Sequence, residues 1–241
     1  MLTHYLSWHA NNFGDRLNDY IFQGLKSLAF RVPVLKNLPN GTALGLGTLL
    51  NHKVLSDCTI LGSGTNGLQV PGIDLNYSFV RGRLTTEKLK LPKKYAVGDT
   101  AFGVRSYFES LACKQIQEIG IIPHYKNLPA IQDDRVIRVD MPYDQFIKRV
   151  SQCKIILTEA MHGAILADCL RIPWAPVSID SKRYPIPRFK WNDFASVLDI
   201  VPEWGDLTAY KLHLSEKYRL DKVSNEVNKR LKTALPLSQH L

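Results

Sequence analysis

The stretch from residue 154 to residue 176, KIILTEAMHGAILADCLRIPWAP, is the feature that most restricts how this chain can fold. It begins with an apolar run, residues 155–157, that suits a buried strand, and residues 161–171 suit a helix. A strand followed by a short crossover and a helix is the repeating unit of an open parallel sheet. In such sheets, ligands bind beyond the carboxyl ends of the strands, where helix N-termini offer N–H groups to anions. We therefore predict an anion site at His162 and Gly163, in the first turn of this helix.

Composition and charge restrict the class of protein. With 241 residues, of which 45% are apolar and 22% charged, the chain suits a soluble globular protein of one or two domains. We expect it in the cytoplasm, because no apolar run approaches the roughly 20 residues of a membrane span and its start lacks a signal-peptide pattern. The net charge of +9 comes from scattered Lys and Arg, without the pattern of an RNA- or DNA-binding module. We therefore expect no nucleic-acid partner. An anionic small molecule or an anionic membrane face accounts for the positive charge at least as well as a nucleic acid would.

Strands and helices alternate along the first half of the sequence. Apolar residues at helical spacing between Leu17 and Leu28 predict a first helix, which follows an opening strand and a turn-rich loop at residues 11–15. Two later strands end in glycine loops, which form either tight turns or contacts with a ligand. The first half thus reads as βαβαβαβ. The expected strands are residues 2–8, 42–47, 58–64, 77–80 and 95–98, and the expected helices are residues 17–28 and 84–91.

A second α/β unit begins near residue 114. We expect strands at residues 116–123, 135–139 and 154–157, a helix that starts near Pro142, and irregular structure at residues 180–193, which contain Pro185 and Pro187. Two βαβ-type halves predict an α/β protein of two Rossmann-like domains that face one another across a cleft. We assign them to residues 1–112 and 113–205, and a C-terminal helical segment to residues 206–241. The helix expected within residues 212–235 either packs on the protein or contacts a membrane surface.

Cationic side chains stand where predicted strands end. Arg81 and Arg83 follow the strand at residues 77–80, where guanidinium groups suit a phosphate or carboxylate; solvated surface residues are the alternative. Further positive charge gathers in the proline-containing segment after the histidine helix, which could close over an anion. These cations are Lys182, Arg183, Arg188 and Lys190. The four cysteines stand far apart and no metal-ligand cluster is present, so we expect no metal site.

Several short motifs, taken together, resemble one known family. They are NFGDRLN at residues 12–18, VRG at 80–82, GD at 98–99, IPHY at 122–125 and TEAMHG at 158–163, followed by IPW at 172–174. In this order they are similar to the polysaccharide pyruvyl transferases, and most of all to the ketal-forming enzymes of exopolysaccharide and capsule synthesis. The likeness extends from about residue 10 to residue 198.

The resemblance implies a two-domain fold like that of the GT-B glycosyltransferases. It implies phosphoenolpyruvate as donor substrate without a further cofactor, and a sugar of a lipid-linked oligosaccharide as acceptor, which receives a cyclic pyruvyl ketal. An enzyme of this kind acts in the cytoplasm, at the inner face of the membrane if it contacts lipid. Many relatives carry an arginine two residues before the histidine, where this chain has Ala160. We expect Arg81, Arg83, Lys182 or Arg188 to replace that charge.

The chemistry assigns roles to these residues. Carbon C3 of phosphoenolpyruvate must gain a proton and phosphate must leave, and histidine is suited to such proton exchange near neutral pH. His162 therefore either protonates C3 or holds the departing phosphate, unless it only caps its helix. Asp15 either orients or deprotonates a sugar hydroxyl, or caps the helix that it begins. We assign Asn12 and Gly14 to the acceptor side, and the donor side to Arg81, Arg83, His124, Gly163, Lys182, Arg188 and Lys190.

Alternative functions share much of this pattern. His124 is either a second functional group or an ordinary loop histidine. A GT-B glycosyltransferase that uses a nucleotide sugar would have the same fold and cleft. A non-catalytic module that binds a glycan or an anion would also retain the cationic residues, but it would not need His162.

Overall fold

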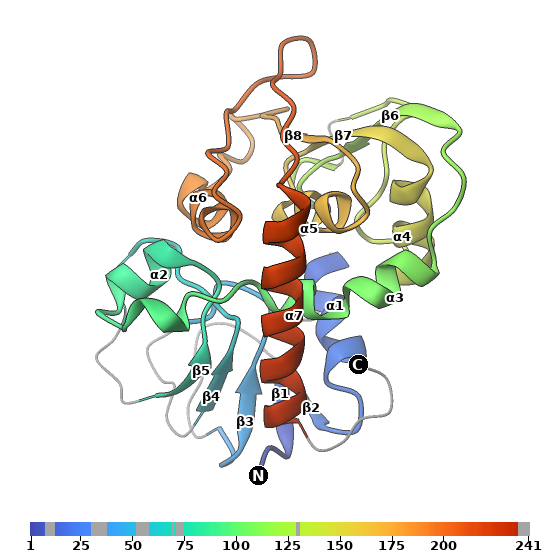
Figure 1. Cartoon of the computed structure of the whole chain (residues 1–241). Coiled ribbons are helices and arrows are strands. Elements are labelled where there is room, and N and C mark those ends of the chain that lie inside the picture. Colours follow the sequence, from blue (N-terminus) through green and yellow to red (C-terminus); the bar gives the residue numbers. More distant parts are fainter. Residues whose placement is uncertain are drawn as a thin grey trace.

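A computed structural model of the chain describes residues 1–7, 13–29, 38–51, 58–68, 70, 75–128 and 131–235 (Figure 1). Within these residues the strands form one five-stranded and one three-stranded sheet. All strand pairs in both sheets are parallel. The protein therefore has a mixed α/β fold with parallel sheets, which is consistent with Rossmann-like architecture. No helix in the described part of the chain combines the length and the apolar character that crossing a membrane requires.

The five-stranded sheet has the order β2-β1-β3-β4-β5. Its strands are β1 (His4–Ser7), β2 (Lys26–Ala29), β3 (Thr42–Leu44), β4 (Cys58–Leu61) and β5 (Asn76–Phe79). Helix α1 (Phe13–Ile21) follows β1, and helix α2 (Arg83–Lys88) follows β5. The strands expected at residues 2–8, 42–47 and 58–64 are confirmed but are shorter than expected, and the strand expected at residues 77–80 is confirmed one residue earlier in the chain.

The prediction of one helix over residues 17–28 was wrong. Helix α1 ends at Ile21, and Gly24 has a φ of +87°, which turns the chain back toward the sheet. Leu28 then pairs with Leu6 as part of strand β2. The strand expected at residues 95–98 is also absent. The 3₁₀ helix η1 (Lys93–Tyr95) and a single bridge between Val80 and Ala96 take its place.

The three-stranded sheet has the order β6-β7-β8 and follows the expected pattern more closely. Its elements are β6 (Gln117–Ile122), α4 (Tyr143–Ser151), β7 (Cys153–Thr158), α5 (Met161–Cys169) and β8 (Trp174–Pro176). Residues 135–139 do not form a strand; Val136 makes one isolated bridge to Ile121. Of the segment expected to be irregular, residues 180–187 are irregular, but helix α6 (Arg188–Ser196) begins within it, because Pro185 and Pro187 precede the helix and leave its hydrogen bonds intact.

The C-terminal helix α7 (Lys217–Ala234) runs along both halves of the protein in Figure 1. Its buried face packs on the 3₁₀ helix η2 (Thr100–Val104), which leads into α3 (Arg105–Ser110). The hydroxyl of Ser224 donates to the Phe102 carbonyl at 2.7 Å, and Asn228 donates to the Gly103 carbonyl at 3.1 Å. The expected C-terminal helix is thus confirmed, and it packs on the protein. The division at residues 112 and 205 stays a prediction.

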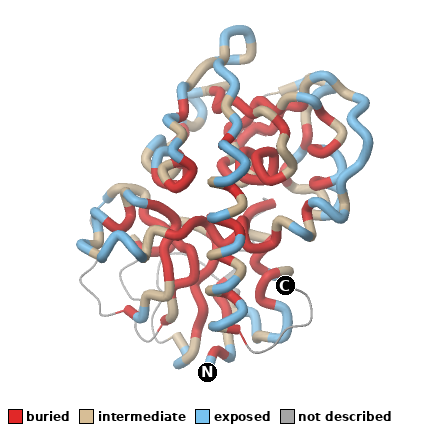
Figure 2. The backbone as a smooth tube through the Cα atoms, in the orientation of Figure 1, coloured by how far each residue is buried: buried red, intermediate tan, exposed pale blue. Residues whose placement is uncertain are grey.

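Contacts near α1 join the two sheets. The rings of Phe13 and Phe146 stack with centroids 4.4 Å apart, and Nη1 of Arg16 donates to the carbonyls of Asp140 and Met141. Figure 2 shows buried backbone running through both sheets and through the region where they meet. The main apolar cluster likewise contains residues of both halves, from Leu2 to Leu235.

A buried ion pair between Arg81 and Asp193 fixes helix α6 against the first sheet. Nε of Arg81 lies 2.9 Å from Oδ2 of Asp193, and neither side chain is exposed. The other two guanidinium nitrogens donate to the Thr48 hydroxyl and the Thr65 carbonyl. Asp193 also accepts hydrogen bonds from the N–H and the hydroxyl of Thr85. The hydrogen bonds to both partners offset the cost of removing two charges from water.

Removing one partner of this pair should destabilise the protein strongly. We expect Asp193→Ala to lower the free energy of unfolding by about 3–5 kcal/mol, because the guanidinium stays buried without its counter-charge. Urea denaturation measures the loss. Arg83→Ala is the control, since its ion pair with Asp199 is half-exposed and is worth at most about 1 kcal/mol. Equal losses in the two variants would contradict a tethering role for Arg81 and Asp193.

Candidate active site

A cavity of about 180 Å³ lies where strands of both sheets end. For comparison, a cavity of roughly 150 Å³ holds a benzene molecule. Its walls come from the start of α1, the loop after β3, the loop after β6, the start of α5, and α6. The lining residues are Phe13, Gly14, Asp15, Gly47, Thr48, His124, Tyr125, Val139, Phe146, Ala160, Met161, His162, Gly163 and Lys190.

Two helices direct their N-termini at this cavity. The first residues of both α1 and α5 line it, and each helix has nine residues. Helix α5 is buried over almost its whole length because its sequence is apolar all round. Its entry is shaped by Thr158, whose hydroxyl accepts a hydrogen bond from the Ala160 N–H at 2.9 Å. Since the N-terminus of a helix carries a partial positive charge, the cavity suits an anion.

His162 faces a buried carboxylate. Its Nε2 atom lies 3.6 Å from Oδ2 of Asp99, and both atoms are buried without a hydrogen-bond partner. The other oxygen of Asp99 accepts from the Ala101 N–H at the start of η2, which holds the carboxylate in place. A separation of 3.6 Å is longer than a hydrogen bond, but catalytic hydrogen bonds often tighten only when substrate binds. Asp99 and His162 therefore form a candidate catalytic pair.

Gly14 holds the other edge of the histidine ring. A Cβ atom on Gly14 would lie 1.8 Å from Nδ1 of His162, so a side chain at this position would displace the imidazole. Gly14 thus acts through His162. Asp15, the next residue, also lines the cavity.

Lys190 supplies positive charge to the cavity. Burial, together with the charges of Arg81 and Lys126, lowers the pKa of Lys190 to about 8, while Asp15 acts in the opposite direction. The lysine keeps part of its accessible surface because it faces the cavity. Lys190 therefore brings a cation to the cavity that Ala160 also lines, and Ala160 stands where the resemblance leads us to expect an arginine.

His124 is neutral at physiological pH. Burial and the nearby charges of Lys190 and Lys126 lower its pKa to about 3. Its Nδ1 accepts a hydrogen bond from the Lys126 N–H at 3.4 Å, so the ring proton lies on Nε2. The ring stacks on Tyr184 with centroids 4.3 Å apart. His124 can donate a hydrogen bond to a ligand, but it does not bring a positive charge.

The structure brings together only some of the predicted site residues. His162, Gly163, Gly14, Asp15, His124 and Lys190 line the cavity. Four predicted donor ligands, Arg81, Arg83, Lys182 and Arg188, are not among the described residues that line it. Arg81 is engaged with Asp193, Arg83 pairs with Asp199, Lys182 is exposed, and Arg188 stacks on Trp204 with Cζ 4.8 Å from the ring centroid. Asn12 lies outside the described residues.

A second cavity of about 280 Å³ adjoins the first. The two share Asp15, Gly47, Thr48 and Lys190, and the second extends to Leu49, Asn66, Tyr184 and Pro187. Asp15 and Lys190 thus stand between two spaces that two ligands could occupy side by side. Within the described part of the chain, no group of three His, Cys, Asp or Glu side chains is arranged to hold a metal ion.

Comparison with known proteins shows to which family the chain belongs. The sequence profile of the family described as Polysaccharide pyruvyl transferase matches residues 74–181, which include Asp99, His124 and His162. The Succinoglycan biosynthesis protein ExoV of Rhizobium meliloti (strain 1021) is 30% identical over 216 residues, and the match covers 83% of this chain. An uncharacterized protein of Acanthamoeba polyphaga mimivirus is 30% identical over 209 residues, covering 78% of this chain and 71% of that protein. The chain belongs to the polysaccharide pyruvyl transferase family.

The chain spans 66% of the length of the Rhizobium protein, just under two thirds. The predicted resemblance to this family is confirmed. In this chain the family match covers the whole second sheet, from β6 to β8, and it begins shortly before β5 of the first. Both members of the Asp99–His162 pair fall inside it.

Sequence reasoning missed Glu159, which organises the loops around the cavity. Its fully buried carboxylate accepts hydrogen bonds from the N–H of His124, the side-chain amide of Asn127 and the N–H of Ile179. These groups follow β6 and β8, while Glu159 itself follows β7. An acidic residue directly after a buried strand was the available signal. Asp99 was noticed only as part of a Gly-Asp motif and was given no role.

The contact between Gly14 and His162 can be tested through stability alone. In the wild type, Gly14→Ala should lower the free energy of unfolding by about 1–3 kcal/mol, because the new methyl group overlaps the imidazole. In a His162→Ala background the same change should be neutral or stabilising, since alanine favours the helix over glycine. A double-mutant cycle of urea denaturation curves measures the difference. Equal effects in both backgrounds would contradict the contact.

Proposed function

We propose that this protein transfers pyruvate from phosphoenolpyruvate to a sugar of an exopolysaccharide repeat unit and forms a cyclic ketal. One observation carries the proposal: His162 faces buried Asp99 in a cavity that two helix N-termini and Lys190 make positive. The name of the Rhizobium relative, a succinoglycan biosynthesis protein, supports a polysaccharide acceptor. We also propose that the two sheets belong to GT-B-like domains and that the acceptor is linked to a lipid at the cytoplasmic face of a membrane.

The donor would bind in the smaller cavity. Phosphoenolpyruvate carries a phosphate and a carboxylate, and both need fixed donors or cations. The N-termini of α1 and α5 can supply N–H groups, and Lys190 supplies a charge. His124, which is neutral, can donate one hydrogen bond from Nε2. No further cofactor is needed for this reaction.

His162 would act as the general acid. As an imidazolium it gives its proton to C3 of phosphoenolpyruvate, while a sugar oxygen attacks C2 and Asp15 accepts the hydroxyl proton. Phosphate then leaves C2 with its bonding electrons and takes up the proton held by Asp15, and a second hydroxyl of the same sugar attacks C2 and gives its proton back to His162. The products are the cyclic ketal and inorganic phosphate. The Asp99 carboxylate would hold the imidazolium in position throughout.

The acceptor would occupy the adjoining cavity. Asp15 lines both spaces, so a sugar hydroxyl there can lie next to a donor bound beside His162. Gly14, which we assigned to the acceptor side, lies against His162, and its lack of a side chain leaves room for the imidazole.

A labelled-substrate assay tests this function. Purified protein with ¹⁴C-labelled phosphoenolpyruvate and an oligosaccharide acceptor should yield labelled sugar and free phosphate. His162→Gln and Asp99→Asn should lower kcat by about 10²–10⁴, the usual contribution of general acid catalysis, with a small change in KM for the donor. Asparagine keeps the oxygen that caps η2, so the fold should be retained, which circular dichroism checks. Transfer of sugar from a nucleotide sugar without transfer of pyruvate would overturn the proposal.

The charge of Lys190 should make donor binding depend on pH. Because the pKa of Lys190 is lowered to about 8, the lysine is charged below that pH and loses its proton above it. We expect KM for phosphoenolpyruvate to rise as the pH increases from 7 to 9. Lys190→Arg should remove this rise, since arginine stays charged, and Lys190→Ala should raise KM by about 10–100-fold at pH 7.

A second change tests whether Lys190 replaces the arginine of relatives. Ala160→Arg in the Lys190→Ala background places a cation at another position in the lining of the same cavity and should recover part of the lost affinity. If KM for phosphoenolpyruvate still rises between pH 7 and pH 9 in Lys190→Arg, the assignment of this pH dependence to Lys190 is wrong.

A further inference from the structure

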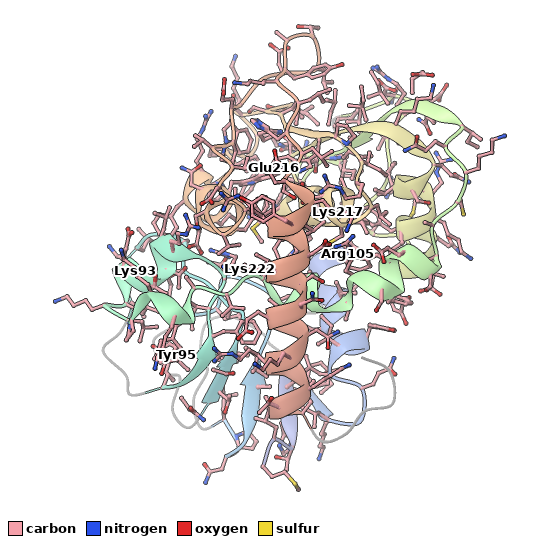
Figure 3. All side chains as sticks on the ribbon, in the orientation of Figure 1. Lys93, Tyr95, Arg105, Glu216, Lys217 and Lys222 are labelled. Atoms are coloured by element: carbon pink, nitrogen blue, oxygen red, sulfur yellow. The ribbon has the colours of Figure 1, made fainter. Side chains whose placement is uncertain are left out.

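A second cationic site lies away from the active site, in a groove of about 250 Å³ between α7 and the segment formed by α2 and η1. Five of its lining residues are cationic: Arg83, Lys93, Lys94, Arg219 and Lys222. Figure 3 shows Lys222 on the flank of α7 and Lys93 on the segment across from it. The described lining of this groove shares no residue with the two cavities of the active site.

Two of the arginines are fixed in position. Asp199 accepts from Nη1 of Arg83 at 2.5 Å, and its other oxygen pairs with Arg219. The two guanidinium groups lower the pKa of this carboxylate, with the Arg83 hydrogen bond as the main cause. One carboxylate thus holds two guanidiniums side by side but neutralises only one charge.

The remaining charges of the groove are not balanced. Glu226, the acidic residue of the lining, pairs with Arg230 at 2.8 Å. Among the residues that the structure describes, no ion pair joins Lys93, Lys94 or Lys222 to a carboxylate. Like charges gathered in a concave surface repel one another, and the field that they create attracts anions. The groove is therefore arranged for a negatively charged ligand.

The chemistry of the groove selects the class of anion. Guanidinium groups offer paired N–H donors that match phosphate oxygens, and lysines add point charges. Because the cations stand on both walls, the groove suits two linked phosphates better than one. The floor is apolar, with Val97, Val197 and Val223, and Tyr218 is 61% exposed at the edge.

We propose that this groove binds a phosphate-bearing anion of the diphosphate class, at a site separate from that of the pyruvate transfer. The proposal gives a role to Arg83, which the sequence assigned to phosphate recognition and which does not line the active-site cavity. It does not depend on the reaction proposed above. Two sources share this chemistry, a free diphosphate and the phosphate headgroup of an anionic lipid.

Titration calorimetry of the full chain with inorganic pyrophosphate at low ionic strength tests the site. We expect Lys93→Ala/Lys94→Ala and Arg219→Ala each to weaken binding by at least about tenfold. Lys229→Ala/Lys232→Ala removes the same two charges from the exposed surface near the other end of α7 and should change the affinity less than about twofold. Lys190→Ala changes the active-site cavity and not the groove, so it should leave the binding of pyrophosphate to the groove unchanged.

Sedimentation with vesicles distinguishes the two sources. Vesicles of phosphatidylcholine with cardiolipin, a lipid that carries two phosphates, compared with phosphatidylcholine alone, report binding to a lipid headgroup. Loss of vesicle binding in Lys93→Ala/Lys94→Ala but not in Lys229→Ala/Lys232→Ala supports the lipid source, and loss of pyrophosphate binding alone supports the free one. The proposal is overturned if the groove variants bind both probes like the wild type, if the control pair loses as much, or if neither probe binds the wild type.

Discussion

The buried pair of Arg81 and Asp193 is the interaction on which the rest of the site depends. It joins the end of the first sheet to α6, a helix that follows the second sheet in sequence. Lys190 lies one turn before Asp193 on α6, so the register that the pair imposes also places the lysine at the cavity. Arg81 also donates a hydrogen bond to the hydroxyl of Thr48, which lines the cavity as well. A charge buried without water needs all these partners, which makes the arrangement rigid.

The candidate catalytic pair has a similar origin. Asp99 stands at the start of η2, between the two sheets, and His162 stands at the start of α5 in the second sheet. Helix α7 packs against η2 from the outside, and Gly14 of α1 limits the histidine from the other side. Three segments far apart in sequence thus fix the position of the His162 ring.

Short-range sequence patterns predicted several strands and helices correctly. The strands before α1 and α5, the helix at Tyr143 and the C-terminal helix were expected from apolar spacing and turn residues. Leu28 shows the limit of such reasoning, because its helical spacing from Leu17 is real but pairing with β1 decides its conformation. Residues 135–139 have the composition of a strand and make only one bridge, and Pro187 begins a helix where an irregular segment was expected. Pairing with residues distant in sequence decided the conformation of the first two segments. In the third, the prolines stand before the helix rather than inside it, so they do not interrupt it.

By itself, the sequence determined the parallel α/β class, the histidine at the end of a strand, and the likeness to pyruvyl transferases, because strand and helix periods and short motifs are local properties of the chain. Only the tertiary structure decided which charges meet that histidine. Arg81 and Arg83 occupy neighbouring positions in an Arg-Gly-Arg motif, yet one is buried against Asp193 and the other faces a separate groove. Lys190, from a segment that looked like a loop, reaches the cavity instead. The direction of a side chain depends on the packing of residues more than a hundred positions away, as with Arg81 and Asp193, and no local pattern contains that information.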